Sequence, residues 1–143
     1  MDDIAEQLVH GDVGPKLKVV LGCGSREFLN STLFDADGDS GSREDSKNLI
    51  EEWKNINSNR VFVSNKDDLM SIDVTKQEQV LGIFGSSHCL YNLEVKEQKL
   101  EAQKPSLAEM TEKAIEILSQ NENGFFLFAE GGRIDHGHRK LID

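Results

Sequence analysis

Short, almost unbroken apolar runs, separated by stretches with helical periodicity, constrain the fold of this chain most. These runs stand at residues 17–21, 60–64, 79–85 and 124–129. Strands that are apolar on both faces must be covered on both faces, which is typical of parallel strands packed between helices. The sequence therefore predicts an α/β fold with a mostly parallel sheet and helices on both faces.

Helical periodicity fills much of the chain between these runs. Apolar spacing predicts helices over residues 2–9, 44–56 and 105–120, and Asn65 can cap a further short helix. The helix over 105–120 is the clearest, because it opens with a Ser-x-x-Glu capping box directly after a proline. The polar stretches that fit neither pattern are predicted as surface excursions: 33–45 and 88–103.

Length and charge limit what such a fold can be and what it can bind. The 143 residues predict one domain over 1–143 with no internal boundary. With 26 acidic against 16 basic residues, the net charge of −10 argues against binding to nucleic acid or to anionic membranes. No segment approaches the roughly 20 apolar residues that cross a bilayer. Residues 1–4 do not begin a signal peptide, so the residues alone predict a soluble cytosolic chain.

Two short motifs resemble binding loops but depart from them. Residues 35–39, Asp-Ala-Asp-Gly-Asp, resemble a calcium loop, yet Ser40 and Ser46 replace the glycine and the bidentate glutamate that an EF-hand requires. A solvated acidic loop is the better interpretation. Residues 22–24, Gly-Cys-Gly, follow a predicted strand as a dinucleotide loop would, but Glu27 replaces the third glycine. This motif is therefore interpreted as a tight turn.

The two cysteines, Cys23 and Cys89, are too few for the disulfide framework of a small secreted domain. His88 beside Cys89 could bind a soft metal, but no second pair stands at the spacing of a zinc site. Two ordinary loop residues are the better interpretation of that pair.

The densest group of potential metal ligands follows the last apolar run. Residues 129–139 read Ala-Glu-Gly-Gly-Arg-Ile-Asp-His-Gly-His-Arg. They would lie at the carboxyl end of a strand, where open α/β sheets collect ligands. Glu130 and Asp135 supply carboxylate oxygens suited to Mg²⁺ or Zn²⁺, and the imidazoles of His136 and His138 suit Zn²⁺. These residues favour a metal site over a salt-bridged surface loop, which remains the alternative.

Two blocks of the chain resemble the animal-type alkaline phosphatases. Residues 105–115 read Pro-Ser-Leu-Ala-Glu-Met-Thr-Glu-Lys-Ala-Ile, and residues 124–138 read Gly-Phe-Phe-Leu-Phe-Ala-Glu-Gly-Gly-Arg-Ile-Asp-His-Gly-His. Weaker similarity at 19–24 and 47–53 keeps the same order, so the resemblance spans nearly the whole chain. It covers an interior part of a much longer catalytic domain, which implies an incomplete alkaline-phosphatase-like fold.

This resemblance implies a phosphate monoester hydrolase that uses two zinc ions and one magnesium ion and passes through a phosphoseryl intermediate. By position, Glu130 matches the magnesium ligand and Asp135 matches a zinc ligand. The family's next zinc ligand is a histidine four residues later, where this chain has Arg139, whose guanidinium cannot ligate a metal. A one-residue shift would bring His138 to that position. The family's Asp-Ser-Ala nucleophile motif is absent from the sequence, so the isolated chain is expected to be inactive.

The resemblance also implies a phosphate monoester substrate, a homodimer, and a parent protein that is lipid-anchored to the membrane at the cell surface or is extracellular. Cys23 and Cys89 do not match the family's disulfide cysteines, which predicts free thiols. A second class of protein remains open. It is a noncatalytic, degenerate fragment that keeps the fold and binds one divalent cation, and Arg139 is the residue that favours it.

Overall fold

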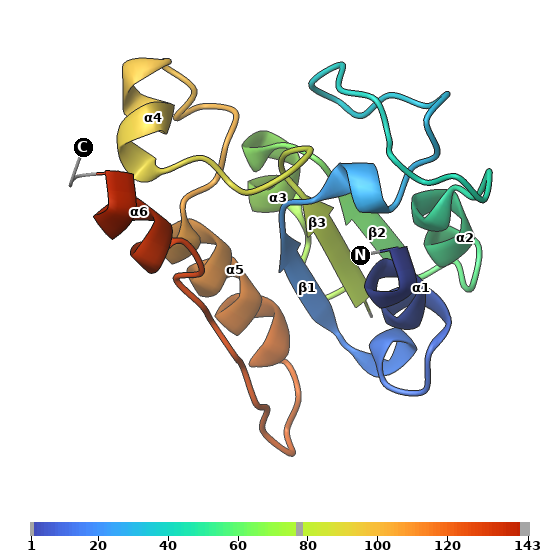
Figure 1. The fold of residues 1–143 in the computed structure, drawn as a ribbon. Helices are drawn as coiled ribbons and strands as arrows, with labels where there is room; N and C mark the ends of the chain where they lie inside the picture. Colours follow the sequence, from blue (N-terminus) through green and yellow to red (C-terminus); the bar gives the residue numbers. More distant parts are fainter. Residues whose placement is uncertain (1, 77–78, 141–143) are drawn as a thin grey trace.

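The computed structural model describes residues 2–76 and 79–140, and its centre is a parallel sheet (Figure 1). The sheet has the strand order β1-β3-β2. Its members are β1 (Val19–Gly22), β2 (Arg60–Val63) and β3 (Gln79–Ile83). Val19 pairs with Val80, and Arg60 pairs with Gln79, so β3 is bonded on both sides.

Helices cover both faces of this sheet, as expected. The helices are α1 (Asp2–His10), α2 (Leu49–Lys54), α3 (Lys66–Ser71), α4 (Asn92–Glu97), α5 (Leu107–Leu118) and α6 (Ile134–Lys140), with short 3₁₀ turns η1 (Gly14–Lys16) and η2 (Ser25–Glu27). α1 and α2 pack on one face, and α3 and α5 pack on the other (Figure 1). The α/β prediction with a parallel sheet is confirmed. None of the helices in the described ranges is long and apolar enough to cross a bilayer.

Alternation of side chains along the central strand divides the core into two layers. Leu81 and Ile83 join the cluster beneath α1 and α2. Val80 and Phe84 join the cluster beneath α3 and α5. Leu81 and Val80 are each only 1% exposed. This two-sided burial explains why the sequence of the strand shows no polar alternation.

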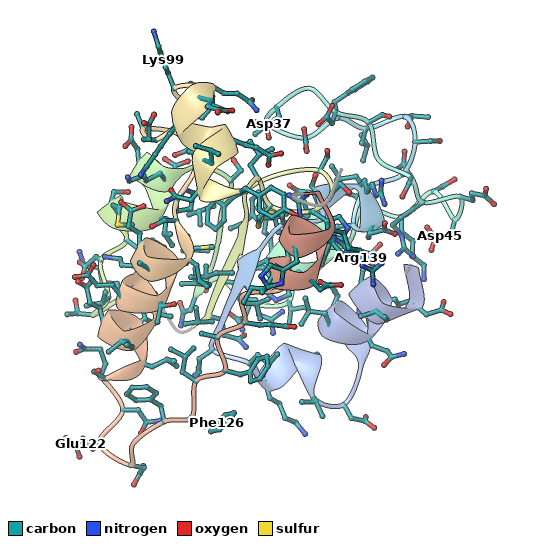
Figure 2. All side chains as sticks on the ribbon, turned by 60° about the vertical axis from the view of Figure 1, so that its left-hand side comes forward. Asp37, Asp45, Lys99, Glu122, Phe126 and Arg139 are labelled. Atoms are coloured by element: carbon teal, nitrogen blue, oxygen red, sulfur yellow. A yellow bond between two sulfur atoms is a disulfide. The ribbon has the colours of Figure 1, made fainter. Side chains whose placement is uncertain are left out.

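The predicted strand over 124–129 is wrong, because this segment forms no strand in the described chain. It runs beside α5 (Figure 1). Residues of β1 and α5, together with residues 126–130, line a hollow. Phe126 and Phe128 are 88% and 74% exposed, and Phe126 stands at the periphery of the molecule (Figure 2). An apolar run becomes a strand only where a neighbouring strand offers backbone partners, and here none reaches it.

Two other boundaries also differ from the sequence prediction. α2 starts at Leu49 rather than near residue 44. The polar excursion over 88–103 contains α4. In both places the helix ends are set by local capping rather than by apolar spacing: Asn48 accepts from the N–H of Glu51, and Glu94 accepts from the N–H of Tyr91 at 2.7 Å.

The acidic loop is held by its own backbone. The Oδ1 atom of Asp35 accepts hydrogen bonds from the N–H groups of Asp37 and Asp39 at 3.0 and 2.9 Å. The ammonium of Lys104 pairs with Asp37. These partners occupy the carboxylates as a structural loop requires. In the Gly-Cys-Gly motif of residues 22–24, Gly24 has a φ of 113°, a left-handed conformation that suits the predicted tight turn.

The N-terminus of α5 carries the capping box that the sequence predicts. Ser106 Oγ accepts from the N–H of Glu109 at 3.2 Å, and the Glu109 carboxylate accepts from the N–H of Ser106 at 2.9 Å. Lys66 Nζ lies 2.6 Å from the same carboxylate. The Lys66 ammonium, helped by the Ser106 N–H, holds the pKa of Glu109 below its ordinary value of 4.5.

We expect Glu109→Gln to destabilise the chain by about 1 kcal/mol at pH 7, because the charged cap is lost. A depressed pKa in the folded state stabilises above the unfolded value of 4.5, and that contribution is lost as the pH falls further. The gap in melting temperature between wild type and variant should therefore shrink below about pH 4.5. Glu112→Gln on the exposed side of the same helix is the control. A gap that stays constant from pH 7 to pH 3 would contradict this assignment.

Candidate metal centre

The candidate ligands lie on the stretch that leads from residues 124–129 into α6. Glu130 is exposed, and no hydrogen bond or ion pair joins it to another described residue. A turn at Gly132 and Arg133 follows, and α6 begins at Ile134. Asp135 lies in the first turn of this helix, where a carboxylate interacts favourably with the N-terminal end of the helix dipole.

The structure brings two of the three predicted ligands to one cleft. Glu130 and His138 both line a cleft of about 1080 Å³, and Asp135 is not among its lining residues. The carboxylate of Asp135 instead lies 4.0 Å from both His136 Nε2 and Arg139 Nη2. The Asp135 and Arg139 side chains are 64% and 81% exposed, so this contact is weak.

The side chains of Glu130, Asp135 and His138 have the right chemistry for Mg²⁺ and Zn²⁺, but they are too few in one place to form a complete metal site. Carboxylate oxygens are ligands for Mg²⁺ and Zn²⁺, and a zinc site takes about four ligands. Over the described ranges, no three His, Cys, Asp or Glu side chains lie close enough together to hold one metal ion. The segment can therefore supply only part of a metal centre.

The prediction that Cys23 and Cys89 are free thiols is wrong. Cys23 and Cys89 form a disulfide, with their Cα atoms 5.3 Å apart. Cys23 directly follows β1, and the N–H of Gly24 donates to the carbonyl of Gly85 at 2.8 Å, just past β3. Parallel neighbours end at the same edge of a sheet, which brings together two cysteines separated by 66 positions. Both cysteines border the cleft that Glu130 lines.

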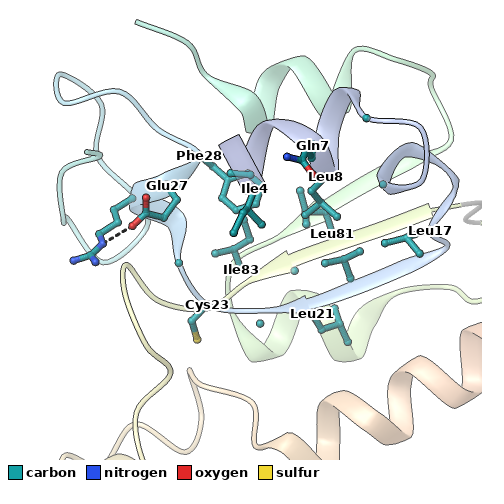
Figure 3. A pocket seen from close by; sticks show the side chains of 18 of the residues that line it. Ile4, Gln7, Leu8, Leu17, Leu21, Cys23, Glu27, Phe28, Leu81 and Ile83 are labelled. Carbon is teal, nitrogen blue, oxygen red and sulfur yellow. Dashed lines mark hydrogen bonds and ion pairs between the residues drawn. The ribbon is translucent and has the colours of Figure 1, made fainter. Parts of the chain in front are cut away.

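A second hollow lies on the other side of β1, beneath α1 (Figure 3). Ile4 and Leu8 of α1 line it together with Leu81 and Ile83 of β3, and Cys23 points away from α1 (Figure 3). Its lining is mostly apolar but also includes Asp12, Arg26, Glu27 and His88. The ligands that the sequence predicts at Glu130 and His138 line the cleft beside the disulfide instead.

Comparison with known proteins matches nearly the whole chain to one family. The alkaline phosphatase family model matches residues 1–141. A membrane-bound alkaline phosphatase of Bombyx mori is 45% identical over 140 residues, a match that covers 95% of this chain and 25% of the relative. An alkaline phosphatase of Gadus morhua is 41% identical over 149 residues, covering 99% and 30%. The crystal structure of Thermus thermophilus alkaline phosphatase superposes with a TM-score of 0.73 at 30% identity, covering 94% of this chain and 24% of that one.

Fold and site together define an incomplete α/β unit in which the segment that carries Glu130 lines a cleft beside the end of β1. The chain belongs to the alkaline phosphatase family. It spans only 25% to 30% of the length of the two relatives described above.

Proposed function

We propose that this chain carries part of the active centre of a phosphate monoester hydrolase, with ligands for one magnesium ion and for one of two zinc ions. The observation that supports this most is the position of the carboxylate of Glu130. It lines a cleft, has no partner among the described residues, and lies within the region that matches the family. The serine that would form the phosphoseryl intermediate belongs, in this proposal, to family segments that this sequence does not match.

Each acidic residue has a separate part in the proposal. Glu130 would hold magnesium, and Asp135 would hold zinc, with His138, which lines the same cleft as Glu130, as a further candidate ligand. When bound, such metals stabilise charge on the phosphoryl oxygens and lower the pKa of a bound water. The residues of this chain present the oxygens and orient them. α6 fixes the backbone of Asp135, and Gly132 and Arg133 form the turn that separates it from Glu130.

The proposal extends to partners and location. The substrate class is a phosphate monoester, and the net charge of −10 argues against nucleic acid as a partner. A homodimer at the cell surface, with a lipid-anchored or extracellular parent, is the proposed setting. The relative from Bombyx mori, named as membrane-bound, supports that location.

A second candidate function is a degenerate fragment that binds a divalent cation without catalysis. Arg139 favours it, since its guanidinium lies 4.0 Å from Asp135 on the same helix face and cannot itself bind a metal. A permanently positive group beside a ligand carboxylate competes with a metal ion for that carboxylate.

A chimera tests the proposed function. The matching 140 residues of the Bombyx mori relative are replaced by this chain, and hydrolysis of a chromogenic phosphate monoester is measured with zinc and magnesium present. We expect an active chimera in which Glu130→Ala lowers the rate by about 100-fold, the scale for loss of one charge-stabilising group. The isolated chain should show no hydrolysis above its own Glu130→Ala variant, because it lacks the nucleophile motif.

The matched control is Glu122→Ala, which removes an exposed carboxylate in the turn after α5. It should leave the chimera unchanged. Arg139→His should raise the activity, because it supplies an imidazole at the position where the family pattern has one. A folded chimera that stays inactive, even with Arg139→His, would overturn the hydrolase proposal and favour the noncatalytic candidate.

A further inference from the structure

Arg133 anchors the segment that carries the candidate ligands, residues 130–138, to the loop that follows β3. Its Nη1 donates a hydrogen bond to the carbonyl oxygen of Cys89 at 2.7 Å. Its guanidinium lies 3.8 Å from the centroid of the Tyr91 ring, and Nη1 is 3.7 Å from the Glu94 carboxylate. The side chain is only 22% exposed. A planar guanidinium is suited to this combination, because it stacks with its face and donates with its edge.

The loop that receives Arg133 is itself tied to the sheet. The N–H groups of Gly24 and Ser25 both donate to the carbonyl of Gly85, at 2.8 and 3.1 Å. Further along the same loop, the disulfide joins Cys89 to Cys23 at the end of β1. The carbonyl that Arg133 binds therefore belongs to a residue with a covalent link to the sheet.

α6 contacts the same loop at two further points. The ring of His136 meets the ring of His88 edge-on, with centroids 5.4 Å apart. Gly137 lies against Tyr91, since a Cβ built on it would be 3.7 Å from the tyrosine ring. Figure 1 shows α6 beside α4 and apart from the three strands. The position of α6 thus depends on a loop whose own position depends on the disulfide.

We propose that Arg133 is a positioning residue through which the redox state of the Cys23–Cys89 disulfide sets the placement of Glu130 and Asp135. The consequence for catalysis rests on the proposed function, because only there do these carboxylates belong to a metal centre. The placement itself can be measured without metal or substrate.

The switching step is an ordinary thiol–disulfide exchange. A dithiol reductant attacks the disulfide, the S–S bond breaks, Cys23 and Cys89 become thiols, and the reductant is oxidised to its own disulfide. Both cysteines are partly exposed and border the cleft, which gives a small dithiol a path to them. After reduction the loop keeps its backbone hydrogen bonds but loses its covalent anchor, and the carbonyl that Arg133 binds becomes free to shift.

Residue-resolved amide exchange, followed by NMR on the 143-residue chain without metal or substrate, tests this proposal. In the oxidised protein, we expect Arg133→Ala to speed exchange in α6 by about tenfold, the scale for loss of a stacked, charge-assisted contact. Arg139→Ala is the matched control, because that side chain is 81% exposed, and it should change exchange at the other α6 amides little. Reduction with dithiothreitol should speed exchange in α6 of the wild type by a similar factor.

The decisive comparison is between reduction and substitution. Once Arg133 is removed, reduction should have a much smaller effect on α6 than in the wild type, because only the contacts of His136 with His88 and of Gly137 with Tyr91 still join the helix to the loop. Equal effects of reduction on α6 in wild type and in Arg133→Ala would overturn the proposal. Reduction also lowers the stability of the whole fold and so speeds exchange at β3 amides such as Val80 and Leu81, equally in wild type and in Arg133→Ala. The coupling is therefore the part of the α6 effect of reduction that Arg133→Ala removes. Arg133→Lys, which keeps the charge but not the planar fork, should give an intermediate effect and serves if Arg133→Ala does not fold.

This readout separates the two proposals. If the chimera is inactive but the exchange data show the expected coupling, the proposed metal-centre function is contradicted and the positioning role of Arg133 is supported. If the chimera is active but the exchange data show no coupling, the positioning role is contradicted and the proposed hydrolase function is supported.

Discussion

Reduction of the Cys23–Cys89 disulfide is expected to lower the free energy of unfolding by about 4 kcal/mol. The bond joins positions that are 66 residues apart, and closing a loop of that length removes much of the conformational entropy of the unfolded chain. The measurement is urea unfolding of the oxidised chain, with and without dithiothreitol, followed by the fluorescence of the single tryptophan. That residue, Trp53, is buried in the core beneath α1 and α2, so its emission reports the global transition.

The control for this measurement is Cys23→Ser. It has no disulfide to break, so its unfolding midpoint should be the same with and without dithiothreitol, and close to that of the reduced wild type. If the midpoint of the wild type did not move on reduction, the bond would contribute nothing to stability, and the loop after β3 would be held by its hydrogen bonds alone.

A disulfide is particularly stabilising in a small unit that buries little apolar surface. The described sheet has three strands, and the phenylalanines at 126 and 128 stay exposed. A small core gains proportionally more from a covalent link. Disulfides also persist mainly in oxidising compartments, which supports the cell-surface location proposed here rather than the cytosolic one that the residues alone predict.

The sequence could predict those parts of the fold that local patterns determine. Three apolar runs became β1, β2 and β3, because each also acquired neighbours in the sheet. The Ser-x-x-Glu motif located the start of α5, since a capping box acts within four residues. The run over 124–129 is also apolar but forms no strand in the described chain, because pairing depends on a neighbouring strand and not on the residues themselves.

The candidate site also has parts that the sequence could predict and parts that it could not. Its acidic residues could be found from composition, since Glu130 and Asp135 stand close together after an apolar run. The disulfide could not, because Cys23 and Cys89 meet only through the parallel pairing of β1 with β3. Arg133 was missed for a similar reason. An arginine in a glycine-rich turn carries no signal until Tyr91, which lies 42 positions earlier in the sequence, is placed beneath its guanidinium.

The core of the unit can be tested by one substitution in its central strand. We expect Leu81→Ala to lower the free energy of unfolding by about 3 kcal/mol, because truncation removes apolar contacts and leaves a cavity that a close-packed interior cannot fill. Leu81 is 1% exposed and belongs to the cluster that joins β3 to α1 and α2. The measurement is again the midpoint of urea unfolding, with the disulfide kept oxidised so that its contribution stays constant.

The matched control is Leu93→Ala, the same substitution on α4 at a side chain that is 65% exposed. Its effect should stay within about 0.5 kcal/mol, as for other surface positions. Similar small effects of both variants would contradict the assignment of β3 as the centre of the core. The two sites are far apart in the fold and share no contacts in the core clusters, so the double variant should show the sum of the two single effects. Additivity would show that the side chains of Leu81 and Leu93 are not energetically coupled.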